Sequence, residues 1–113
     1  MSKYINYGDV NPIEHGGIFV LQESETSFRI VKNEFDGSKK HYLFDLHIDI
    51  SDTWIDKESV LSYIGMTELD FDPVQYAIGC TEYYSYLEFG GNAEVYATKK
   101  ELIAAYAEYG III

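Results

Sequence analysis

The stretch "HYLFDLHIDI", residues 41–50, constrains the fold more than any other part of the chain, because its side chains alternate in character. Every second residue from Tyr42 to Ile50 is apolar, and the residues between them are mostly polar. Successive side chains of a β-strand point to opposite faces, so this period of two predicts a half-buried antiparallel strand. Such a strand needs partner strands and a layer that covers its apolar face.

Two shorter apolar runs come before this strand. They are "GGIFVLQE" and "SFRIVKN", and the turn residues of "SETS" and "FDGSKK" separate the three runs. This order predicts a three-stranded meander. A short strand at "EVYAT", residues 94–98, or at the C-terminal "GIII", residues 110–113, would bring the count to four.

The second half of the chain changes to helical periodicity. Asp56 as a cap and Gly65 as a left-handed stop predict a helix over residues 57–64. Asp72 followed by a proline predicts the start of a second helix over residues 73–87. Gly79 within that helix is unfavourable by roughly 1 kcal/mol relative to alanine.

A third helix is predicted to run from Thr98 to Gly110, with Glu101 completing a capping box. Packing the three helices on one face of a small antiparallel sheet of about three to four strands gives an α+β fold with two layers. A length of 113 residues suits one domain, residues 1–113.

The negative charge of the chain is unevenly distributed. Between His41 and Thr98 there are eleven acidic side chains and one basic side chain, a net charge of −10 out of −11 for the whole chain. Such a surface repels phosphate and anionic lipids and attracts basic proteins. The sequence therefore predicts no direct nucleic-acid or membrane binding. It also has no apolar run of roughly 20 residues and no apolar signal core, so we expect a soluble, cytoplasmic protein.

"MTELDFDP", residues 66–73, places acidic side chains at every second position. A calcium loop that began at Glu68 would need glycine and glutamate where the chain has Pro73 and Gly79, so a calcium site is excluded. If the segment is extended, Glu68, Asp70 and Asp72 point to one side, while Leu69 and Phe71 anchor the other side on the core. A solvated loop with Asp72 as a helix cap is the simpler interpretation.

Tyrosines and acids alternate in "EYYSYLEFGGNAEVY", residues 82–96. Tyrosine offers a flat contact surface at low entropic cost, and carboxylates attract lysine and arginine from a distance. The partner-binding candidates from this segment are Glu82, Tyr83, Tyr86 and Glu88, which join Glu68, Asp70 and Asp72.

Other polar groups give no positive support for an enzyme. Asp45, His47 and Asp49 are chemically adequate metal ligands. Alternate residues of a flat strand lie roughly 7 Å apart, however, so these side chains would share one ion only with strain. Glu14 and His15 beside two glycines are typical of a turn, and Cys80 of a buried small side chain. We expect no catalytic residue, no metal and no cofactor.

The segments "SDTWIDKESVLSYIGM" and "FDPVQYAIGCTEYYSYLEFGGN" resemble small acidic proteins carried by mobile genetic elements of Gram-positive bacteria. This resemblance covers roughly residues 49–92 and implies no catalytic residue. The size, acidity and tyrosine content of the chain are also similar to those of anti-CRISPR and antirestriction proteins. That likeness is one of general character and transfers no site.

These observations lead to the hypothesis of a non-enzymatic inhibitor. Its partner would be a basic, nucleic-acid-handling bacterial defence protein, such as the CRISPR effector nuclease Cas9, on which its carboxylates compete with nucleic acid. The alternative is a general interaction module without nucleic-acid mimicry, for instance a homodimer formed through tyrosines or the C-terminal edge. A third hypothesis is a small metal-dependent enzyme that uses His47, Asp45 and Asp49.

Overall fold

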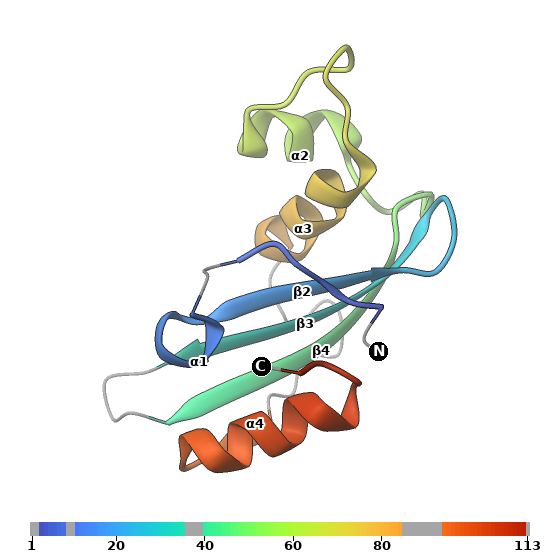
Figure 1. The fold of residues 1–113 in the computed structure, drawn as a ribbon. Helices are drawn as coiled ribbons and strands as arrows, with labels where there is room; N and C mark the ends of the chain where they lie inside the picture. Colours follow the sequence, from blue (N-terminus) through green and yellow to red (C-terminus); the bar gives the residue numbers. More distant parts are fainter. Residues whose placement is uncertain (1–2, 9–10, 36–39, 85–93, 113) are drawn as a thin grey trace.

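A computed structural model describes residues 3–8, 11–35, 40–84 and 94–112 (Figure 1). The strands formed by these residues are β1 (Ile5–Asn6), β2 (Gly17–Gln22), β3 (Ser27–Phe35), β4 (His41–Asp49) and β5 (Glu94–Tyr96). The helices are α1 (Pro12–His15), α2 (Lys57–Ile64), α3 (Pro73–Tyr83) and α4 (Lys99–Glu108).

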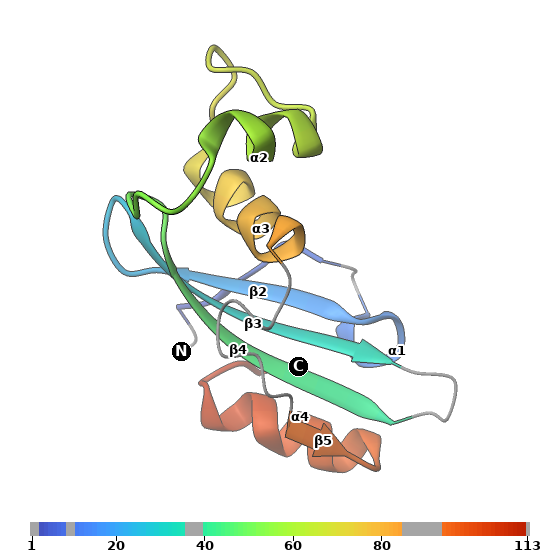
Figure 2. The same cartoon turned by 180° about the vertical axis from the view of Figure 1, so that it is seen from behind.

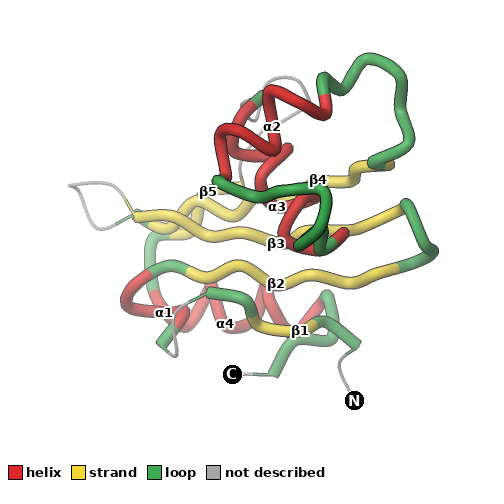
Figure 3. Tube along the Cα trace, turned by 90° about the horizontal axis from the view of Figure 1, so that it is seen from above, coloured by secondary structure: helices red, strands yellow, loops and turns green. Residues whose placement is uncertain are grey.

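The strands form one antiparallel sheet in the order β1-β2-β3-β4-β5 (Figure 3). The predicted meander is confirmed in β2, β3 and β4. The sheet has five strands and not three to four, because "EVYAT" contributes β5 and the two-residue β1, too short to show alternation, pairs with β2. The predicted strand at "GIII" is absent over residues 110–112, where Ile111 is instead buried in an apolar cluster.

Helices cover both faces of this sheet, so the predicted two-layer arrangement with every helix on one face is wrong. On one face, Phe28, Ile30 and Leu46 pack against α2 and α3. Val31 and Leu43 point the opposite way and pack against α1 and α4. Figures 1 and 2 show α3 and α4 on opposite sides of the strands.

The face of β4 that was predicted to be mostly polar explains this difference. His41 and Leu43 lie on this face, and both are buried, whereas Asp45 and His47 on the same face are exposed. The helix α4 therefore covers one end of the strand face only. The alternation predicts one polar face along the whole of β4. It cannot show that a helix far away in the sequence covers one end of that face.

Local side-chain chemistry sets the predicted helix ends. Asp56 accepts a hydrogen bond from the Ser59 amide at the start of α2, and Gly65 ends that helix at a φ of 69°. Asp72 caps α3 by accepting from the Val74 amide at 3.0 Å. These caps satisfy amides that a helix cannot pair internally. The helix α3 ends at Tyr83 with Tyr84 as its C-cap, so the predicted continuation is wrong at Tyr84; residues 85–87 of the predicted span lie outside the described part of the chain.

The capping of α4 by Thr98 is also confirmed, although the return bond of the predicted capping box goes to the amide before the cap. The Glu101 amide donates to Thr98 Oγ1 at 3.1 Å, and the Glu101 carboxylate accepts from the Ala97 amide at 3.2 Å. Gly110 follows the helix with a φ of 80°, a left-handed conformation that suits glycine.

A buried polar bridge joins α4 to the sheet and to α1. The Asn33 amide group donates to the Pro12 carbonyl oxygen at 2.9 Å, and Asn33 Oδ1 accepts from the Tyr106 hydroxyl. Asn33 and Tyr106 are both buried, and the Tyr106 ring packs edge-on against Phe19. The hydrogen bonds satisfy polar groups that burial would otherwise penalise.

The contact between α2 and α3 depends on Gly79. A Cβ atom at this position would lie 2.5 Å from Ile64 Cγ2, closer than side chains pack. Gly79 is unfavourable for the helix by propensity, and it is the residue that lets α2 approach α3 closely.

Candidate protein-binding surface

The segment of residues 51–84, here called the helical unit, contains α2, α3 and their connector and carries a net charge of −6. It extends from one end of the molecule on one side of the sheet (Figures 1 and 2). Its one basic side chain is Lys57. Its acidic side chains are all exposed: Asp52, Asp56, Glu58, Glu68, Asp70, Asp72 and Glu82.

The described acids of the rest of the molecule are more often paired. Glu14 accepts from Lys99 Nζ at 2.6 Å, and this hydrogen bond lowers the pKa of the Glu14 carboxyl. Asp45 pairs with Arg29 at 3.4 Å, and Glu34 with Lys32 at 3.5 Å. Within the helical unit the corresponding interaction is a pair of exposed side chains, Lys57 and Glu68, at 3.3 Å. Neighbouring cations therefore compensate the negative electrostatic field of the helical unit less than that of the rest of the molecule.

The connector between α2 and α3 does not present its carboxylates as an extended strand would. Asp70 accepts from the Thr67 hydroxyl at 3.0 Å and its amide donates back to Thr67, which closes a turn over residues 67–70. Leu69 is 98% exposed, so the prediction that it anchors the connector on the core is wrong. Phe71 does pack against the core, and the Lys57 amine lies 4.8 Å above its ring.

The seven partner-binding candidates therefore have different positions. Glu68 and Asp70 lie in the connector, Asp72 caps α3, and Glu82 and Tyr83 lie exposed near the end of that helix. Tyr86 and Glu88 lie outside the described residues.

A row of aromatic rings crosses the helical unit, and the sequence interpretation assigned only one of them. The ring centroids of Trp54 and Tyr84 lie 4.9 Å apart in an edge-on contact. The centroids of Tyr84 and Tyr83 lie 5.0 Å apart, and those of Tyr83 and Tyr63 of α2 lie 5.4 Å apart. The Tyr84 hydroxyl accepts from the Asp56 amide at 2.6 Å, which fixes this ring against the start of α2. Trp54, Tyr63 and Tyr83 are exposed.

The sequence holds one signal for this row. Tyr63 lies off the apolar stripe of α2 formed by Val60, Leu61 and Ile64, so a helix with that stripe in the core must expose the tyrosine. Its contact with Tyr83, however, depends on how the two helices cross, and no local pattern reports that.

A shallow groove of about 440 Å³ lies beside two of these rings. Tyr63 and Tyr83 line it together with Glu58, Ser59 and Ser62 of α2. The groove thus combines aromatic faces with a carboxylate, and Ser59 Oγ is held by a 2.7 Å hydrogen bond to Asp56. This combination suits a cationic group better than a neutral one.

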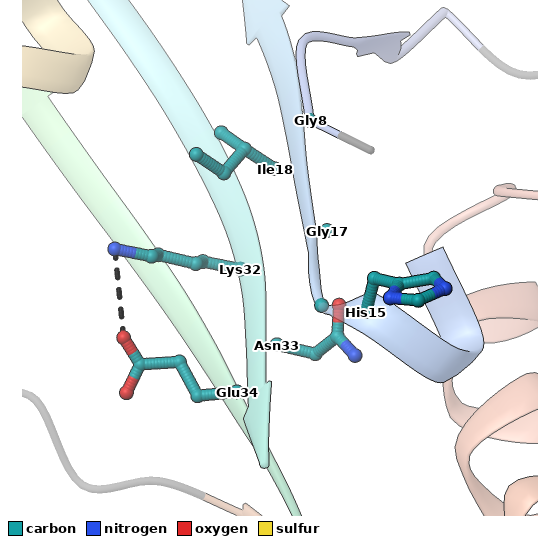
Figure 4. Close-up of a pocket in the computed structure, with 8 residues that line it drawn as sticks. Gly8, His15, Gly17, Ile18, Lys32, Asn33 and Glu34 are labelled. Atoms are coloured by element: carbon teal, nitrogen blue, oxygen red, sulfur yellow. Dashed lines mark ion pairs between the residues drawn. The ribbon is translucent and has the colours of Figure 1, made fainter. Parts of the chain in front are cut away.

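A second open pocket, of about 470 Å³, lies where α1 meets β2 and β3 (Figure 4). Lys32 and Glu34 project to one side of β3 and pair with each other, whereas Asn33 projects to the other side. The Asn33 side chain is already bonded to Pro12 and Tyr106. These polar groups do not converge on one point, as substrate chemistry would require.

The strand residues considered as metal ligands have other partners. His47 lies 3.2 Å from Glu23, and Asp49 accepts from the Ser51 amide and hydroxyl, which lowers the pKa of Asp49. Among the described residues, no three His, Cys, Asp or Glu side chains are close enough together to hold a metal ion.

Cys80 is buried in the core, as predicted, and burial raises the pKa of its thiol to about 11. This thiol is therefore protonated near neutral pH. None of the described helices is long and apolar enough to cross a bilayer.

Comparisons of the chain with protein-family profiles, with curated proteins and with solved structures found no match.

Proposed function

We propose that this protein is a non-enzymatic inhibitor that binds a basic, nucleic-acid-handling defence protein and competes there with nucleic acid. The observation that carries the proposal is the helical unit, in which seven exposed acidic side chains accompany one basic side chain. Carboxylates gathered on one unit offer a basic cleft a substitute for phosphates. The exposed connector and the aromatic row supply contact area beside them.

A CRISPR effector nuclease such as Cas9 is the partner class to test first, because it holds its nucleic acids in a positively charged channel. Electrostatic steering would speed association, and desolvated aromatic contacts would slow dissociation. The steering effect makes a definite prediction about salt, because exposed charges are screened within roughly 10 Å at 0.1 M ionic strength.

The test measures displacement of labelled target DNA from a Cas9–guide RNA complex by fluorescence anisotropy. We expect the protein to displace the DNA at low salt and to lose about tenfold in affinity at moderate salt. The variant Glu68→Lys/Glu82→Lys should weaken binding by about tenfold. Its control, Glu25→Lys/Glu108→Lys, has the same net charge but changes exposed acids outside the helical unit.

Equal losses in the two double variants would show that net charge alone drives binding and would contradict a role for the helical unit. Binding that is indifferent to salt and to both variants would contradict nucleic-acid competition. The alternative function, a homodimer formed through the exposed tyrosines, predicts a concentration-dependent mass in light scattering without any partner.

A further inference from the structure

We propose that the groove between α2 and α3 binds an arginine side chain of a basic protein partner. This inference rests on the proposed function and adds to it the residue type that is recognised. The groove is lined by Glu58, Tyr63 and Tyr83, and only Tyr83 was a candidate from the sequence.

The two rings form an open corner. Their centroids lie 5.4 Å apart and their planes are inclined by 70°, so one ring face can stack on a planar group while the other ring borders it. The exposed fractions of Tyr63 and Tyr83 are 56% and 42%, which leaves the rings accessible from solvent. A cation over an exposed aromatic face gains about two- to fivefold in affinity.

Glu58 supplies the complementary charge in the same groove. It is exposed, and no ion pair involves it within the part of the chain that the structure describes. Its position in the first turn of α2 also places the carboxylate where the helix dipole favours negative charge. The carboxylate is therefore available to an incoming cation.

Arginine fits this arrangement better than lysine. A guanidinium group is planar, stacks on aromatic rings and donates two parallel hydrogen bonds to one carboxylate, whereas an ammonium group is a compact, strongly hydrated charge. The row of aromatic rings continues from Tyr83 through Tyr84 to Trp54, whose indole nitrogen donates to Asp52 at 3.2 Å. A second basic side chain of the same partner segment would therefore meet another aromatic ring beside a carboxylate.

A second copy of this chain is a poorer occupant. The chain contains one arginine, Arg29, and it already pairs with Asp45 on the sheet. Charge also argues against it, because two copies of the helical unit repel each other. The structure therefore favours a different, arginine-bearing protein.

The test uses two short peptide probes, one of alternating glycine and arginine and one of alternating glycine and lysine. Each is titrated into the isotope-labelled full-length protein at low salt, and NMR shifts report the site and the affinity. We expect the arginine peptide to bind about three- to fivefold more tightly and to shift the signals of Ser62, Tyr63 and Tyr83 most strongly.

Variants separate the ring from the charge. Tyr63→Leu should remove most of the preference for arginine, and Tyr63→Phe should retain it, because phenylalanine keeps the aromatic face. Glu58→Gln should weaken the arginine peptide about threefold, while Glu108→Gln, which removes the same charge from α4, should have less than about half that effect.

Equal affinities for the two peptides, or equal effects of Glu58→Gln and Glu108→Gln, would overturn the arginine site. Neither result would touch the displacement of DNA from Cas9, so the two proposals fail separately. Signals of Tyr63 and Tyr83 that shift on dilution without peptide would assign the groove to self-association and would also overturn the proposal.

Discussion

The helical unit and the side of the sheet that carries α4 differ in how their polar side chains are paired. Around α4, polar side chains bond to one another: Asn33 to Tyr106 in the interior, and Glu14 to Lys99 at the surface. In the helical unit, carboxylates cap helices or face solvent, and the helices meet through apolar contacts at Gly79. The two regions therefore differ in what balances their carboxylates. Glu14 beside α4 pairs with a lysine, whereas most carboxylates of the helical unit bond to amides and hydroxyls or face solvent, and they keep an outward negative field.

The largest expected effect tests the interior of the α4 side. Tyr106→Phe removes the hydroxyl that donates to Asn33 Oδ1 and leaves this buried acceptor without its partner. We expect a loss of about 2 kcal/mol in the free energy of unfolding, measured by urea denaturation. The control Tyr63→Phe removes an exposed hydroxyl and should change stability by less than about 0.5 kcal/mol. Similar losses in both variants would break the distinction between the two regions.

A second prediction tests the apolar contact of the helical unit. Alanine is intrinsically better than glycine in a helix by about 1 kcal/mol, and yet Gly79→Ala should destabilise the protein by about 1–2 kcal/mol, because its Cβ collides with Ile64. In a double-mutant cycle, Ile64→Ala should relieve the collision, so that alanine at position 79 costs less or becomes favourable. A stabilising Gly79→Ala in the wild-type background would contradict the close approach of α2 and α3.

The smallest expected effect concerns pH and the α4 side. Burial lowers the pKa of His41 below its ordinary value of 6.5, and the positive charge of Lys99 lowers it further. The folded state thus favours the neutral imidazole. The contribution of His41 to stability is complete above pH 6.5 and is lost as the pH falls through the lowered pKa, because protonation costs more in the folded than in the unfolded protein. Between pH 7.5 and 5.5 the melting temperature should therefore fall. His41→Gln should reduce this fall, whereas the exposed His15→Gln should preserve it.

The starts of α2, α3 and α4 and the ends of α2 and α4 could be predicted because their causes are local. Asp56, Asp72 and Thr98 bond to amides two or three residues away, and Gly65 and Gly110 adopt left-handed conformations after the last turn. The side of the sheet on which α4 lies is a different matter. It depends on contacts between residues as distant as Asn33 and Tyr106, and no sequence window contains both.

The candidate surface shows the same limit. Glu82 and Tyr83 are exposed near the end of α3, but the connector forms a turn because the Thr67 side chain bonds to Asp70. The groove was missed because it joins Glu58 and Tyr63 of α2 to Tyr83 of α3. Its members come together only when the two helices pack.

The strands β4 and β5 are neighbours in the sheet, although the chain between Asp49 and Glu94 includes the whole helical unit. Substitutions of outward-facing side chains in the segment between β4 and β5 do not change the backbone hydrogen bonds that pair these two strands. Such a layout lets natural selection or a protein engineer vary recognition while the hydrogen-bonded scaffold stays constant. A library restricted to the exposed positions of residues 51–84, with the capping residues Asp56, Gly65 and Asp72 kept constant, should therefore vary the proposed recognition surface on a folded protein.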